Sequence, residues 1–312
     1  CTFGAGSSLI YNTTGTYNRG IEWGSTQTHP GWPANVVVQN NTTLILNNGT
    51  NPPNANRYCS ASLSIASGST LTLNNTGAYT PNVLKVGGNF DLNGTLNLPG
   101  TLAAYGEDIY VSGNWTRSAT GVFNPNDRAV YLDGTTSSTI TANGGETFPY
   151  LRITKTAAAN TVLLADNINI TKELSITTGT FNPQNKDCIL KSDANYTANL
   201  TAITAAQGII TYGGTGRFIV ERYIPTATGG SPNHTKSWQL LAVPVNGDNQ
   251  TINAAWQEGQ APLVVGTNGL GTIITNNVAG TGFDIVGGVG PSMKTYQSLG
   301  GTWQGISATN IT

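Results

Sequence analysis

Residues 84–100 read LKVGGNFDLNGTLNLPG, and their apolar residues come in alternating pairs separated by Gly, Asn and Thr. The pairs are Leu84 with Val86, Phe90 with Leu92, and Leu96 with Leu98. Alternation over only three residues predicts a very short strand with one buried face. Gly and Asn tolerate the positive φ of sharp corners, so the stretch predicts short strands joined by tight turns.

The same pattern continues along most of the chain, and a sustained helical spacing of apolar residues is missing between residues 30 and 225. Leu63, Leu84, Ile109, Val130 and Leu151 follow one another at intervals of 21 to 25 residues. A recurrence of this length is typical of a solenoid. We therefore predict an all-β fold, a right-handed parallel β-helix in which these five residues point inward and each coil pairs with the next about 4.8 Å along the axis. The turn-forming Asn93-Gly94 pair within this stretch keeps an antiparallel sandwich as the alternative.

Changes in composition along the sequence predict three regions. Residues 1–35, with Trp23 and Trp32, are expected to form an N-terminal cap, and residues 36–224 the parallel β-helix. Residues 225–312 are expected to form a second β-rich, sandwich-like unit that is incomplete, because the protein is expected to continue beyond Thr312. Within that unit, residues 250–259 predict a short helix, and four residues are expected in its core: Trp238, Leu240, Val243 and Trp256.

Composition excludes several classes of function. Only 9% of the residues are charged and the net charge is −1, so we expect no nucleic-acid partner. No apolar run approaches the ~20 residues of a membrane helix, so no membrane span is predicted. The chain begins at Cys1 without Met, which suggests export. Cys1 is then either lipidated or joined to Cys59 by a disulfide, whereas Cys188 is expected to be a small buried hydrophobe.

Three segments carry a family resemblance: EWGSTQTHPGWPANVVV (22–38), the coil from Phe148 to Phe181, and GRFIVERYIP (216–225) followed by KSWQLLAVPV and TINAAWQEG. Together they resemble large secreted and surface proteins of Bacteroidota, of the kind exported by type IX secretion. The sorting domain typical of that family is absent from this sequence. The resemblance implies an extracellular or outer-surface protein and names no ligand.

Catalytic chemistry has few candidates in the sequence. Parallel β-helices also host polysaccharide lyases and hydrolases, whose acids cluster on one outer face. Here the acidic candidates are Glu107, Asp108, Asp127 and Asp133, with Arg128 as the basic one. No nucleophile elbow, zinc motif or phosphate loop occurs, and His29 and His234 have no other metal-ligating residues near them at a typical spacing. We therefore predict no catalytic residue, no cofactor and no metal ion.

Aromatic residues are the candidate glycan contacts. YGEDIYVSGNW (105–115) offers Tyr105, Tyr110 and Trp115, for which packing under a loop is the competing interpretation. The sequence as a whole favours a non-enzymatic extracellular module, a cell-surface stalk or adhesin. Glycans or other surface and matrix components are its expected partners, with self-association open. The alternatives are a carbohydrate-active β-helix enzyme and a self-assembling extracellular fibre subunit.

Overall fold

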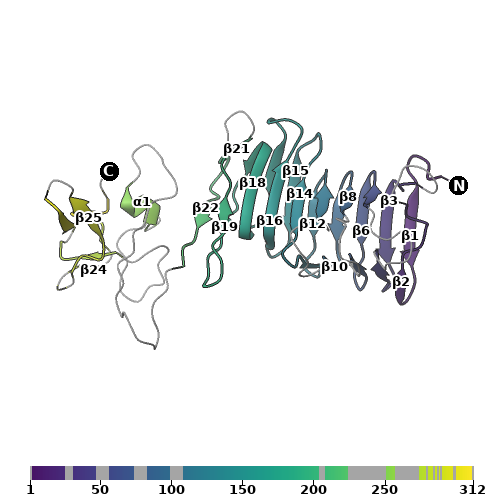
Figure 1. The fold of residues 1–312 in the computed structure, drawn as a ribbon, viewed down its shortest axis with the longest axis horizontal. Helices are drawn as coiled ribbons and strands as arrows, with labels where there is room; N and C mark the ends of the chain where they lie inside the picture. The colour runs from purple at the N-terminus through teal and green to yellow at the C-terminus, as the bar shows by residue number, and fades with distance from the viewer. Residues whose placement is uncertain are drawn as a thin grey trace. The chain divides into compact units, whose positions relative to one another are not determined.

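The computed structural model describes residues 2–24, 31–46, 56–73, 83–98, 108–203, 208–223, 251–256, 274–278, 280–283, 285–286, 288, 290–297 and 300–310. The chain divides into two compact units, Cys1–Pro225 and Thr226–Thr312. The first unit is a stack of short strands that lie side by side from β1 to β22 (Figure 1). Neighbouring strands along the stack are parallel, which makes this unit a parallel β-solenoid, as predicted. It has about seven turns.

Three sheets run along the solenoid. The first contains β1 (Ser8–Asn12), β3 (Asn35–Gln39), β6 (Ser62–Ile65), β9 (Phe90–Leu92), β12 (Trp115–Arg117), β15 (Ser138–Ala142), β17 (Thr161–Leu164), the end of β18 (Ile168–Asn182) and β21 (Gly208–Ile210). The second contains β2 (Thr16–Asn18), β4 (Thr43–Ile45), β7 (Thr70–Thr72), β10 (Thr95–Asn97) and β13 (Val122–Asn124). The third contains β5 (Arg57–Cys59), β8 (Leu84–Val86), β11 (Ile109–Val111), β14 (Ala129–Leu132), β16 (Glu146–Thr154), the rest of β18, β19 (Cys188–Leu190), β20 (Asn199–Leu200) and β22 (Phe218–Val220).

The core follows the predicted register on the third sheet. Leu84, Ile109, Val130 and Leu151 pair in succession across β8, β11, β14 and β16, and all four are fully buried. Leu63 also points inward, but it pairs with Phe90 on the first sheet. Leu63 and Leu84 therefore lie on two different sheets. Their spacing resembles the repeat because one coil of this solenoid carries more than one alternating triplet.

Asn and Gly shape the corners between strands. Asn40 and Asn41 both adopt the left-handed conformation, with φ of 58° and 57°, directly after β3. Other Asn side chains bond to the next coil: the amide oxygen of Asn89 accepts the backbone N–H of Asn114 at 3.0 Å, and that of Asn114 accepts the N–H of Thr139 at 2.9 Å. The abundance of Asn is thus explained by backbone groups at the corners, which need a partner wherever the strand ladder is interrupted.

The solenoid begins earlier than the predicted boundary at residue 36. β1 pairs with β3 and β2 pairs with β4, both in parallel, so residues 8–18 already belong to the first coil rather than to a separate cap. Trp23 is fully buried and its indole N–H donates to the carbonyl of Tyr58 at 3.0 Å. The Trp-rich segment therefore contributes to the solenoid core itself.

The second unit is described in part. It contains the predicted short helix α1 (Ile252–Trp256), the parallel pair β23 (Thr275–Asn276) and β24 (Ile285–Val286), and the antiparallel pair β25 (Lys294–Gln297) and β26 (Thr302–Gly305). Its small core consists of Ile274, Phe283 and Ile306, against which Trp256 packs as expected. The described strands do not amount to a sandwich, and Trp238, Leu240 and Val243 lie outside the described residues.

Two cysteines are buried in the solenoid as free thiols. Cys188 is the small buried hydrophobe that the sequence predicts. Cys59 is also free, so the disulfide alternative does not hold for it; burial raises the pKa of its thiol to about 12. In the part of the chain that the structure describes, no helix has both the length and the apolar character needed to cross a membrane.

Candidate functional site: an outer row of aromatic and cationic side chains

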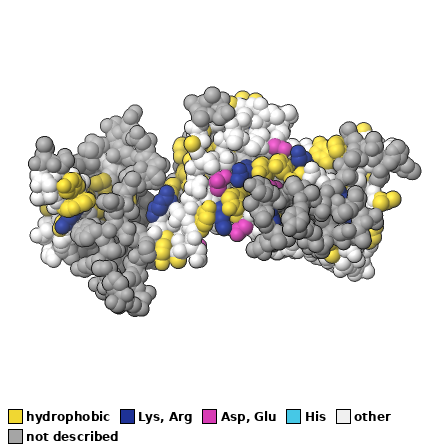
Figure 2. All heavy atoms as spheres, in the orientation of Figure 1, with side chains coloured by type: hydrophobic (Ala, Val, Ile, Leu, Met, Phe, Trp, Pro, Cys, Tyr) yellow, Lys and Arg dark blue, Asp and Glu magenta, His cyan; other side chains and the backbone are white. Residues whose placement is uncertain are grey.

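The register that stacks apolar residues inside the third sheet also stacks side chains outside it. The middle residues of β5, β8, β11, β14 and the matching position of β16 pair in succession across five coils. We call them the outer row: Tyr58, Lys85, Tyr110, Tyr131 and Arg152. Figure 2 shows basic, acidic and hydrophobic side chains gathered on the solenoid face that it presents, over the coils that contain β14 and β16.

Ring and cation contacts hold the middle of the outer row together. The rings of Tyr110 and Tyr131 stack with centroids 4.1 Å apart and an interplanar angle of 9°. The Lys85 Nζ lies 4.9 Å from the Tyr110 centroid, and the Arg152 guanidinium carbon lies 5.7 Å from that of Tyr131. Each tyrosine therefore faces the other ring on one side and a cation on the other, which leaves ring edges and hydroxyls as the groups presented outward.

Acidic residues flank the outer row without completing a catalytic group. Asp108 precedes β11 and its carboxylate accepts the backbone N–H of Ala129 at 2.9 Å, whereas that of Asp133 accepts the Ser112 hydroxyl at 2.7 Å. Burial raises the pKa of the Tyr110 hydroxyl; Tyr131 and then these two carboxylates raise it further. Burial likewise raises the pKa of Asp108, against the lowering effect of the Ala129 N–H.

The remaining residues predicted for a cluster of acids each have a different environment. Asp127 is exposed and pairs with Lys172 at 3.2 Å, and Arg128 is buried. Glu107 lies outside the described residues. The three described acids thus each bond to a backbone amide, a hydroxyl or a lysine of the fold, and no contact among the described residues brings two of them together as a catalytic pair.

Of the three predicted glycan contacts, only Tyr110 lies in the outer row. Trp115 is fully buried, with Phe90, Phe123 and Phe148 around it at centroid distances of 4.7, 4.9 and 5.6 Å. Its assignment as a surface contact is therefore wrong, because the first residue of β12 points into the core. Tyr105 lies outside the described residues.

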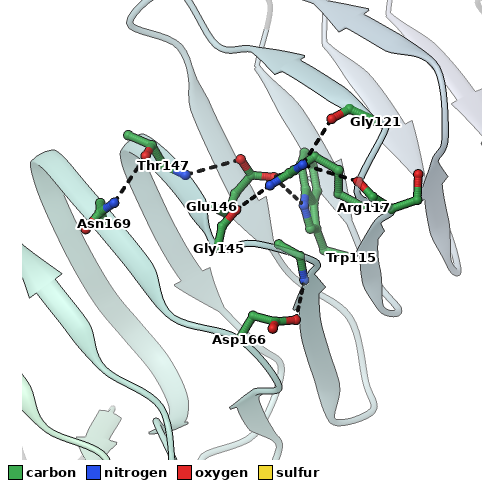
Figure 3. A network of polar contacts seen from close by, with 10 residues as sticks. Trp115, Arg117, Gly121, Gly145, Glu146, Thr147, Asp166 and Asn169 are labelled. Atoms are coloured by element: carbon green, nitrogen blue, oxygen red, sulfur yellow. Dashed lines mark hydrogen bonds and ion pairs between the residues drawn. The ribbon is translucent and has the colours of Figure 1, made fainter.

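A buried polar network lies beside Trp115 and is structural in character (Figure 3). The Glu146 carboxylate accepts the Arg117 Nε–H at 2.9 Å, the Trp115 indole N–H at 3.3 Å and the Thr147 backbone N–H at 3.2 Å. Arg117 also donates to the carbonyls of Gly145 and Gly121. Burial raises the pKa of Glu146 even though Arg117 opposes that shift. The network joins neighbouring coils at a corner and leaves no face of Glu146 for a substrate.

Sequence reasoning did not single out Tyr58, Lys85, Tyr131 or Arg152. The signal that identifies Lys85, Tyr131 and Arg152 is the interval already used for the core, whereas Tyr58 follows Arg57 and joins the row through its pairing with Lys85. Residues one position after Leu84, Ile109, Val130 and Leu151 recur at the same spacing and face outward together.

Among the described residues, no group of His, Cys, Asp and Glu is arranged to hold a metal ion. The chain matches no protein-family model, no curated protein and no solved structure at a significant level.

Proposed function

We propose that the chain is a non-enzymatic extracellular module, a surface stalk or adhesin that holds partner molecules on the outer face of its solenoid. The observation that carries this proposal is the single hydrophobic cluster that runs along the solenoid from Tyr11 to Ala198. Because each coil covers the apolar face of the next, the unit is suited to bear load along its axis and to present a repeated surface.

The chemistry of that surface supports an extracellular adhesive role. The low charge of the sequence, the outward Thr and Asn, and the outer row together provide hydroxyls, amides, phenols and a few cations. Groups of this kind form hydrogen bonds with sugar hydroxyls and with acidic substituents. The resemblance to secreted surface proteins of Bacteroidota supports the same location and use.

The test combines retention with product analysis. Purified full chain is passed over surfaces coated with neutral and acidic polysaccharides, with and without Ca²⁺, and the eluted sugars are analysed. We expect retention on some of these surfaces without new reducing ends or unsaturated products. Turnover that disappears in Asp127→Ala or Asp133→Ala would replace this proposal with an enzymatic one, and absence of retention on every surface would refute the adhesive role.

A further inference from the structure

A cavity of about 340 Å³ opens beside β5 and β8, at the Tyr58 end of the outer row. The described residues that line it are Trp32, Asn56, Arg57, Tyr58 and Lys85. The Trp32 ring meets the Tyr58 ring edge-on, with centroids 4.6 Å apart. The volume is at the small end of the range of ligand pockets, about 300–1,000 Å³, and suits one sugar unit.

The two aromatic walls are held by the solenoid backbone. Tyr58 is fixed by its strand position, and a Cβ added at Gly87 would approach its hydroxyl to 2.8 Å and the Ser60 carbonyl oxygen to 2.6 Å. Only glycine leaves the room that the Tyr58 side chain occupies over this corner. The cavity is therefore built into the coil rather than formed by a side chain that swings freely.

The charge of the cavity is positive. Arg57 and Lys85 line it, and none of the lining residues in the described part of the chain is acidic. Burial lowers the pKa of Arg57 to about 10, with Arg19 lowering it and Glu22 raising it, so Arg57 is still a cation at neutral pH.

Lys85 supplies the accessible cation. Its side chain is exposed, its ammonium group lies over the Tyr110 ring, and no described acid pairs with it. The neighbouring cation of the row differs, because Arg152 is bonded to Glu173 at 3.2 Å. A further donor lies in the wall, since the Trp32 indole N–H is buried with no hydrogen-bond partner among the described residues. A buried donor of this kind gains from a ligand oxygen.

The outer row extends from the cavity along the solenoid. From Tyr58 to Arg152 the row crosses four strand spacings, about 19 Å at about 4.8 Å per coil. Its ring edges and hydroxyls face outward along that length. A linear polymer lying along the axis would contact successive coils through the same kind of group.

We propose that the cavity binds a carboxylate-bearing sugar unit of a linear acidic polysaccharide, and that the adjoining units lie along the outer row. This inference rests on the adhesive function proposed above and names the class of its ligand. Lys85 pairs with the carboxylate, and the Trp32 and Tyr58 rings, in edge-on contact with each other, form one wall beside the ring of the sugar.

The test uses the full chain and oligosaccharides of three linear uronate polymers: polygalacturonate, alginate and hyaluronate. Each is compared by calorimetry with its carboxyl methyl ester, which keeps the backbone and removes the charge. We expect at least one acid form to bind, its ester to bind at least about tenfold more weakly, and added salt to weaken the acid form, because a charge-assisted contact is lost or screened.

Variants locate the site. Lys85→Met is expected to lower the affinity about tenfold, Lys85→Arg to keep most of it, and the matched control Lys186→Met, at the turn before β19, to leave it unchanged. Lys85 is exposed, so its variants should fold, which circular dichroism checks. Equal binding of acids and esters, or unchanged binding by Lys85→Met, would overturn this inference while the adhesive proposal stands. Lack of binding to all three acids would overturn it as well, and retention on neutral polysaccharides then decides the adhesive proposal separately.

Discussion

Replacement of Arg117 by Met tests the reading of the buried network in Figure 3. The variant removes the 2.9 Å bond to Glu146 and the donors to the Gly145 and Gly121 carbonyls. The Glu146 carboxylate would keep only the Trp115 and Thr147 N–H groups in a site where its side chain is 7% exposed. Removal of one partner from a buried ion pair typically costs about 3–5 kcal/mol, and we expect a loss of that size at pH 7.

The pH dependence gives the prediction its specificity. Burial already raises the pKa of Glu146 in the folded chain, so the folded state takes up this proton at a higher pH than the unfolded state does. Stability from this group is therefore greatest at acid pH and is lost as the pH rises through its folded pKa. Without Arg117 the folded pKa rises further, so the cost of Arg117→Met should shrink as the pH falls from 7 toward about 4, near the ordinary Glu pKa.

The assay is urea unfolding followed by tryptophan fluorescence and far-UV circular dichroism at several pH values. Arg117→Met combined with Glu146→Leu is the matched control, because it removes both charges and should recover much of the loss. A cost below about 1 kcal/mol at pH 7, or one that does not change with pH, would refute the reasoning, since the pair would then behave as a solvent-exposed bridge.

Three further outcomes follow from the solenoid. Leu92→Ala should cost about 2–5 kcal/mol in urea unfolding, because Leu92 is fully buried; a loss under about 0.5 kcal/mol would place it on the surface. Gly94→Ala should lower the melting temperature sharply, because the added Cβ would lie 2.2 Å from the Ser69 carbonyl oxygen. The control Gly4→Ala should not lower it, because the space around Gly4 is open. Equal effects of the two substitutions would contradict the corner geometry. Burial lowers the pKa of Lys155 to about 8. Between about pH 8 and 10 the unfolded chain therefore holds a proton that the folded chain has lost. The unfolding free energy of the wild type relative to Lys155→Met should rise across that range. A flat difference would place the Lys155 ammonium in water and a falling one would mean that Asp133 outweighs burial, and either would contradict the prediction.

The short alternating triplets were sufficient to predict the solenoid and its inward residues. Few other folds place alternating apolar triplets at a recurring interval of this length. Leu84, Ile109, Val130 and Leu151 pair as their spacing predicts. The division into three sheets was not predictable from that interval. Triplets on different sheets share one pattern, so Leu63 was placed in line with Leu84 when its partners are Val36 and Phe90.

The positions of buried polar side chains could not be predicted from the spacing of apolar residues either. Lys155 is almost fully buried and donates to the carbonyls of Ser112 and Asp133 and to the Ser138 hydroxyl. Arg19 bonds likewise to the Leu46 carbonyl at 2.9 Å. Such side chains are placed by unpaired carbonyls at the corners, and those carbonyls leave no periodic trace in the sequence. Trp115 was misplaced for a related reason, because a polar stretch around it concealed an inward strand position.

The outer row and the core arise from one cause, which bears on how the chain would hold a polymer. A parallel register places equivalent residues in line, so apolar residues stack inside the sheet while Tyr110 stacks on Tyr131 outside it. That stacking covers the ring faces on which a sugar would otherwise lie. Contacts along the row must then come from ring edges and hydroxyls, which are individually weak and tolerant of ligand type. Selectivity requires a position where the aromatic stacking is interrupted, and Lys85 is that position, since its side chain separates Tyr58 from Tyr110 beside the positively charged cavity. The row would thus supply length of contact, and the cavity the choice of an acidic unit.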